Sequence, residues 1–214
     1  MGQQESDYLA KLARVYADVP SSQGPQRMGV RLRRMLEALE AREHPDVVLI
    51  DSRAGLHDLA AAAITGMADT ALLFATDSPQ TWLGYRQLFT HWQRRPEVVR
   101  RVRERLAIVR ALTPRSDREG GVKRFQDKAY ELFAETLYDA IPPATSASIV
   151  DYFHPIETDQ SAPHFPILVD WDERFQEFEP SLRPEQGGAT EAQIDAAFGT
   201  LIRWVMRRVN GGEA

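Results

Sequence analysis

The sequence predicts an α/β fold in which a mainly parallel sheet carries helices on both faces. Short apolar runs rich in β-branched residues alternate with longer segments whose apolar residues recur at helical spacing. Such alternation implies right-handed crossovers between parallel strands. With 214 residues, 43% of them hydrophobic, the chain can bury one sizeable core.

The expected elements follow one another along the chain. Helices are predicted over 6–17, 26–43, 56–66, 79–92, 96–105, 122–136 and 190–208, and strands over 47–50, 70–75, 106–112, 137–141 and 166–169. Residues 1–25 are expected to form a helix and a loop ahead of a single domain over 26–214. Within that domain, 144–188 is rich in proline and acids and is expected to wrap irregularly. Thr190 is the expected N-cap of the closing helix.

The first predicted strand ends in an acid. Four large apolar residues precede Asp51, and Gly55 follows it in a tight turn. An acid at the carboxyl end of a buried parallel strand points into the crevice where open α/β sheets bind ligands. There Asp51 could hold Mg²⁺ directly or through water, and Gly55 would let a backbone N–H approach a phosphate. Alternatively, Asp51 caps the helix that begins near Leu56.

The residues around this strand resemble a known family. Asp51-Ser-Arg-Ala-Gly-Leu56, the segment Ala68-Asp-Thr-Ala-Leu-Leu-Phe-Ala75 and the segment Ser78-Pro-Gln-Thr-Trp-Leu-Gly-Tyr85 follow in order. Together they resemble the ParA/MinD-like (SIMIBI-type) P-loop ATPases, in particular the variant branch whose phosphate loop has the sequence KGGVGR. The resemblance is good over 46–89 and weaker through 208. It implies that Asp51 and Gly55 belong to the Walker B strand and switch II, with ATP and Mg²⁺ as cofactors.

The same resemblance implies further nucleotide-binding positions. Thr76, Asp77, Thr113 and Pro114 follow later strands and would lie near the nucleotide, whereas Pro142 would lie near its base. For Asp77 the alternative is an N-cap ahead of Ser78 and Pro79.

The phosphate loop of that family is missing from this sequence. Such a loop needs glycines followed by a lysine that reaches the phosphates, yet the chain has no Gly-Lys pair and only three lysines, Lys11, Lys123 and Lys128. The run from Gly120 to Lys123 comes after the predicted Walker B strand and is interpreted as a turn before a helix. We therefore expect the carboxyl-terminal part of an ATPase that is inactive alone and completed by a missing amino-terminal region or a partner chain. The alternative is a catalytically degenerate protein-interaction module with the same fold, and a homodimer is compatible with either.

Other chemistries find little support in the composition. Without cysteine there are no disulfides and no thiolate chemistry, and no Gly-x-Ser-x-Gly or His-Glu-x-x-His motif occurs. His154 and His164 flank an acidic loop, a minor metal-site alternative. No apolar run is long enough for a membrane span and no secretory signal opens the sequence, so the cytoplasm is the expected location.

Charge is distributed unevenly along the chain. The net charge is −5, but residues 94–118 hold nine arginines against three acids, and 151–195 hold eleven acids against two arginines. The basic stretch is interpreted as the solvated face of a helix built on Val98, Val99, Val102 and Leu106. Non-specific contact with nucleic acid is the alternative.

Overall fold

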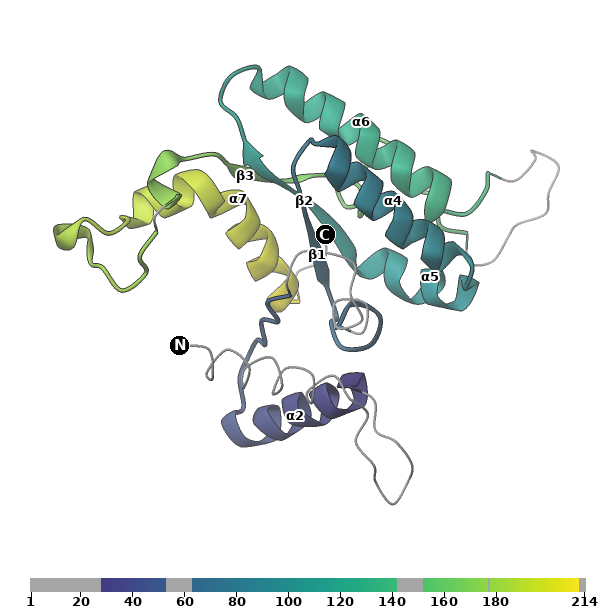
Figure 1. Ribbon diagram of the computed structural model, residues 1–214, viewed down its shortest axis with the longest axis horizontal. Coiled ribbons are helices and arrows are strands. Elements are labelled where there is room, and N and C mark those ends of the chain that lie inside the picture. The colour runs from purple at the N-terminus through teal and green to yellow at the C-terminus, as the bar shows by residue number, and fades with distance from the viewer. Residues whose placement is uncertain (1–27, 53–62, 142–151, 177, 212–214) are drawn as a thin grey trace, which may run out of the picture. The chain divides into compact units, whose positions relative to one another are not determined.

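The computed structural model describes residues 28–52, 63–141, 152–176 and 178–211 (Figure 1). The chain divides into two compact units, Met1–Ala68 and Asp69–Ala214.

The first unit contains the predicted helix at 26–43. It is α2, Met28–Glu43, and none of its side chains is buried. The Arg33 guanidinium donates to the carbonyl oxygen of Gly66, which ends a helical turn at 63–66. That turn is the described part of the helix predicted over 56–66; residues 56–62 lie outside the described ranges.

The strand predicted at 47–50 is not a strand in the structure. These residues have no regular secondary structure, and Leu49 is 85% exposed where a buried position was expected. A lone extended segment has no partner for its backbone N–H and C=O groups, because strand pairing must come from a neighbour. The described residues of the first unit contain no second strand to provide one. Apolar sequence alone therefore did not determine the state of this segment.

The second unit is built on a three-stranded parallel sheet. Its strands are β1, Ala71–Ala75, β2, Leu106–Thr113, and β3, Ile167–Asp170, in the order β1-β2-β3. Both pairings are parallel, which confirms the predicted α/β class. The register pairs Ala75 with Arg110 in β1 and β2, so the two strands finish at the same edge.

Helices cover both faces of this sheet (Figure 1). One face carries α4, Pro79–Gln93, α5, Pro96–Val102, and α6, Arg118–Thr136; the other carries α7, Glu191–Val209. The described residues of this unit also form short 3₁₀ turns: η1 at Arg103–Arg105, η2 at Glu173–Phe175 and η3 at Pro184–Gln186. The helices at 79–92, 96–105 and 190–208 and the strands at 70–75, 106–112 and 166–169 are confirmed within a few residues.

The two faces of the sheet bury different side chains, because successive strand residues point to opposite sides. On one face, the fully buried rings of Phe89 in α4 and Phe133 in α6 meet edge to face at 5.2 Å. On the other face, α7 packs on alternate residues of β2 and β3. This second cluster consists of Ala107, Val109, Ile167 and Val169, with Leu72, Phe198, Leu201 and Trp204 against it.

Two local predictions in the second unit are wrong. Residues 137–141 form no strand; Leu137 caps the carboxyl end of α6, and the Tyr138 ring packs against Phe133 at 5.9 Å. Gly120 and Gly121 form no turn, since α6 already begins at Arg118. Gly121 is buried beneath a side chain of the sheet, and that packing outweighs the low helix propensity of glycine.

The cap and the basic stretch can also be compared with their predictions. Thr190 is the N-cap of α7 as predicted, and its hydroxyl accepts from the backbone N–H of Gln193. Val99 and Val102 are buried as expected for the apolar side of the arginine-rich stretch. Two of its arginines, Arg103 and Arg110, are nevertheless buried rather than solvated, each only 4% exposed.

Candidate functional site: the carboxyl edge of the sheet

The polar residues predicted after β1 and β2 gather at one edge of the second unit. Thr76 and Asp77 directly follow β1, Thr113 is the last residue of β2, and Pro114 comes next. Because β1 and β2 are adjacent and parallel, these ends share what is called here the carboxyl edge. Both strands lead into helices, α4 and α6, on the same face of the sheet (Figure 1). The edge therefore lies beside two helix N-termini, which favour negative charge.

Hydroxyl groups line the start of α4. Ser78 is the N-cap, and its Oγ accepts from the backbone N–H of Thr81 at 3.3 Å. The Ser78 and Thr81 hydroxyl oxygens are 2.9 Å apart, and the Thr76 hydroxyl lies 3.2 Å from that of Thr81. The alternative prediction of Asp77 as the N-cap is therefore wrong, because the neighbouring serine provides the cap.

Asp77 is instead held by side chains from two helices. Its Oδ1 accepts from the indole N–H of Trp82 in α4 at 2.8 Å and from the Lys128 ammonium in α6 at 2.7 Å. Partial burial alone would raise the pKa of Asp77, but the hydrogen bonds from Lys128 and Trp82 outweigh it and hold the pKa below its ordinary value. Asp77 is thus a carboxylate at neutral pH that joins β1, α4 and α6.

Arg110 is the residue of this edge that the sequence reasoning missed. It lies in β2 opposite Ala75, its guanidinium carbon is 5.6 Å from the centroid of the Phe125 ring, and its Nη1 has no hydrogen-bond partner among the described residues. Burial lowers its pKa, although a guanidinium remains protonated at neutral pH. One arginine inside the otherwise apolar run Leu106-Ala-Ile-Val-Arg110 was the available sequence signal.

The backbone of β2 is irregular just beyond Arg110. The pairing with β3 shifts register between Arg110 and Thr113, and Leu112 has a φ of 54°, which is rare for a bulky residue. Such bulges redirect side chains near the ends of strands and occur often beside functional sites. Here the irregularity turns Leu112 out, where it is 53% exposed.

The structure gives Thr113 and Pro114 different surroundings. Thr113 is fully buried; its hydroxyl donates to the Arg110 carbonyl oxygen at 3.2 Å, and its own carbonyl oxygen accepts from the backbone N–H of Trp171 at 2.9 Å. Pro114 is exposed at the surface. Of the two, only Pro114 can meet a ligand without rearrangement.

Ion pairs between distant charged segments surround the edge. Arg118 at the start of α6 pairs with Asp170 at the end of β3. Asp172 lies 3.8 Å from Arg115 of the basic stretch. It also accepts from its near neighbour Arg174, whose hydrogen bonds lower the pKa of Asp172 to about 2. The acidic 151–195 segment thus partly neutralises the basic 94–118 stretch, a pairing that sequence order does not reveal.

The remaining predicted site residues lie elsewhere. Asp51 is in the first unit, exposed and without regular secondary structure. Gly55 and Pro142 lie outside the described residues, so their predicted roles stay predictions. Among the described residues no group of three or more His, Cys, Asp or Glu side chains could hold a metal ion. A lone carboxylate such as Asp51 fits the usual way in which proteins bind Mg²⁺, through one or two carboxylates together with substrate phosphates.

The two loop histidines are engaged in hydrogen bonds within the protein. His164 is fully buried: its Nε2 donates to the Glu157 carbonyl oxygen at 3.1 Å, and its Nδ1 accepts from the Tyr138 hydroxyl at 2.7 Å. His154 lies 2.7 Å through Nδ1 from the Asp139 carbonyl oxygen. A neutral imidazole satisfies both bonds of His164, so the structure gives the metal-site alternative no support.

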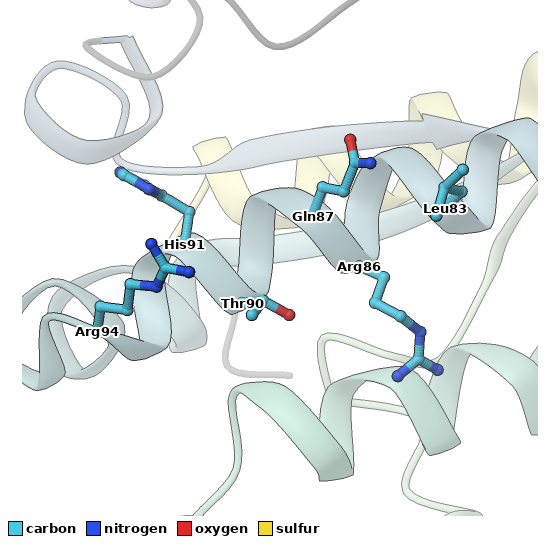
Figure 2. Close-up of a pocket in the computed structure, with 6 residues that line it drawn as sticks. All are labelled: Leu83, Arg86, Gln87, Thr90, His91 and Arg94. Atoms are coloured by element: carbon cyan, nitrogen blue, oxygen red, sulfur yellow. The ribbon is translucent and has the colours of Figure 1, made fainter.

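A shallow surface hollow lies apart from the carboxyl edge. Figure 2 shows six residues along one side of α4 and just beyond its end: Leu83, Arg86, Gln87, Thr90, His91 and Arg94. Its Arg86 already pairs with Glu135 of α6. A hollow lined by one helix and the residue after it has no converging polar groups, which distinguishes it from a typical ligand site.

Comparisons with protein-family models, with curated proteins and with solved structures find no match for this chain. Among the described helices, none has the length and apolar character needed to cross a membrane.

Proposed function

We propose that this chain forms the carboxyl-terminal part of a ParA/MinD-like ATPase, which takes its phosphate loop from outside residues 1–214. In this proposal Asp51 positions Mg²⁺, directly or through water, and Gly55 lies near the terminal phosphate. Thr76, Asp77 and Pro114 border the nucleotide, the buried Thr113 fixes the end of β2 through its hydrogen bonds to Arg110 and Trp171, and Pro142 lies near the base. The bound ATP and Mg²⁺ would supply the reacting phosphate and the charge that stabilises its transfer.

The observation that carries the proposal is the carboxyl edge. An all-parallel sheet with helices on both faces ends there in Thr76, Asp77 and Pro114, and two helix N-termini lie beside it. Open α/β sheets bind their ligands at this edge. Hydroxyl groups, a cationic Lys128 and the buried Arg110 give it the composition expected next to phosphates.

The exposed segment before Asp51 bears on the same proposal. Val47, Val48, Leu49 and Ile50 are between 37% and 85% exposed, an unusual state for four consecutive large apolar residues. The proposal requires this segment to become a strand in the completed ATPase, which would bury these side chains and place Asp51 at a strand end. Its present exposure is what an incomplete domain would display.

The same exposure favours the second candidate, a catalytically degenerate interaction module. In that case Val47–Ile50 and the exposed Met35 and Leu39 of α2 would bind a protein partner without any nucleotide. The two candidates differ in whether the assembled protein binds ATP together with Mg²⁺.

A nucleotide titration followed by thermal unfolding separates them. The chain is combined with a polypeptide that carries a Gly-rich loop ending in Lys or Arg, the reading frame directly upstream being the first source to inspect. The ATPase proposal expects ATP with Mg²⁺ to raise the melting temperature well above ATP with EDTA, since a ligand that binds only the folded state stabilises it. A partner that binds equally with and without nucleotide, and no shift with Mg²⁺ and ATP, would favour the interaction module. The chain alone is expected to show no ATP hydrolysis.

A further inference from the structure

Arg110 carries a charge that its surroundings leave incompletely paired. Its side chain is 4% exposed, and Nη1 makes no hydrogen bond within the described part of the chain. Leaving a charged donor buried without a partner is costly, and arginine cannot avoid the cost by losing its proton. A buried guanidinium in this state points to a negatively charged partner.

The carboxylates around Arg110 are engaged with other cations. Asp77 accepts from Lys128 and Trp82, and Asp117 pairs with Arg124 at 2.7 Å. Asp170 pairs with Arg118. The local acids therefore neutralise the other cations and contribute only at longer range to Arg110.

The guanidinium of Arg110 lies against the first turn of α6. A Cβ added at Gly121 would come within 2.9 Å of Nη2 and 3.4 Å of Nη1, so the missing side chain makes room for the guanidinium. The N-cap Asp117 makes no side-chain capping bond and pairs with Arg124 instead. The carboxylates of Asp117 and Glu119 lie at this end of the 19-residue helix, but Asp117 does not cap its first-turn N–H groups. A helix N-terminus and a buried guanidinium at one place form a strong site for an oxyanion.

We propose that Arg110 and the first turn of α6 bind a phosphate group. The planar guanidinium matches phosphate oxygens through two parallel N–H bonds, and the first turn of α6, which the Asp117 side chain does not cap, adds the positive end of a helix dipole. Both proposals place phosphate at the carboxyl edge, but binding here requires neither Asp51 nor an external phosphate loop, so this site can hold phosphate even if the ATPase proposal fails. The phosphate can belong to free inorganic phosphate or to a nucleotide.

The test uses inorganic phosphate, with chloride at equal ionic strength as the reference, on the whole chain. Thermal unfolding and ³¹P line width are recorded for the wild type, Arg110→Met and Gly121→Ala. The matched control is Gly84→Ala, because a Cβ at Gly84 meets nothing within 4 Å and the change also lies inside a helix. A parallel series with ATP and EDTA distinguishes a nucleotide from free phosphate as the source.

Phosphate is expected to raise the melting temperature of the wild type and of Gly84→Ala beyond the chloride effect. Arg110→Met should weaken binding at least tenfold, and Gly121→Ala should weaken it several-fold by displacing the guanidinium. If Arg110→Met fails to fold, the phosphate affinity of Gly121→Ala is compared with that of Gly84→Ala, and this difference tests the site. A response to ATP alone that is lost in these variants supports the site with a nucleotide as the source. Equal affinity in Gly121→Ala and Gly84→Ala, or no response of the wild type to either ligand, would overturn the proposal.

Discussion

Asp77 and Lys128 lie 2.7 Å apart between Oδ1 and Nζ, although 51 residues separate them in the sequence. The bond ties the end of β1 to the middle of α6, and Trp82 adds a second donor to the same oxygen at 2.8 Å. The Trp82 ring in turn packs on Phe125, with centroids 4.9 Å apart. A single carboxylate thus fixes the relative position of the strand and both helices that border the carboxyl edge.

Replacing Asp77 with Ala should destabilise the second unit by about 1 kcal/mol at neutral pH. The hydrogen bond from Lys128 to the Asp77 carboxylate is charge-assisted. Lys128 is about half exposed, however, and solvent screening limits the stabilisation that such a pair provides. The free energy of unfolding in urea measures the effect. Asp127→Ala is the matched control, because Asp127 pairs with Lys123 on the exposed side of the same helix and should cost less.

The pH dependence of this difference follows from the lowered pKa of Asp77. A carboxyl group whose pKa falls on folding stabilises the protein above its unfolded pKa, about 4, and loses that contribution as the pH falls through the folded value. The gap between wild type and Asp77→Ala should therefore stay constant from pH 7 to about pH 5 and shrink below about pH 4. A gap that widens in acid would contradict the Asp77–Lys128 assignment.

Protonation of His164 should destabilise the fold in mild acid. Burial lowers the pKa of His164, and its two hydrogen bonds, to Tyr138 and to the Glu157 carbonyl, suit the neutral ring. Below the unfolded pKa of about 6.5 the unfolded chain binds a proton that the folded chain resists, so stability falls by at most about 1.4 kcal/mol per pH unit.

Urea unfolding of wild type and His164→Gln at pH 7.0 and 5.5 measures this contribution. The wild type should lose more stability between the two values than the variant does. His91→Gln, at an exposed position of α4, serves as the control and should keep the wild-type dependence. Identical losses in wild type and His164→Gln would show that His164 does not carry the effect.

Phe89→Ala should be the more damaging of two aromatic truncations. Phe89 is fully buried and contacts the rings of Trp92 and Phe133, so its removal leaves a cavity and should cost about 3–5 kcal/mol. Phe74 in β1 is 52% exposed, and Phe74→Ala should cost less than about 1 kcal/mol. Chemical denaturation of both variants checks the order, and a larger loss for Phe74→Ala would mean that β1 has a packing partner on that side.

The sequence was sufficient for the elements whose periodicity is strong. The strand at 70–75 was predictable as a short apolar run, and the closing helix was predictable because its apolar residues recur at helical spacing over several turns. The state of segment 47–50 could not be predicted in this way, because a short apolar run becomes a strand only where neighbouring strands pair with it. The strand prediction for 137–141 was wrong for the same reason. Leu137 and Tyr138 are buried at the end of α6, where Tyr138 packs on Phe133, and they do not join a sheet.

The candidate site was predictable only in part. Thr76, Asp77 and Pro114 lie at the carboxyl edge because strand direction alone places them there. The partners of Asp77 could not be predicted, since Lys128 and Trp82 arrive through packing of two helices. Arg110 was counted among solvated arginines because charge in a sequence gives no indication of burial unless the strand register is known.

ATP hydrolysis by the chain joined with a phosphate-loop polypeptide tests the central claim most directly. The assembled wild type should hydrolyse ATP only with Mg²⁺, and Asp51→Ala should reduce the rate by orders of magnitude, because metal placement contributes much of phosphoryl-transfer catalysis. Asp46→Ala, at another exposed acid of the same segment, should keep the wild-type rate. Hydrolysis by residues 1–214 alone, or an unchanged rate in assembled Asp51→Ala, would contradict the account.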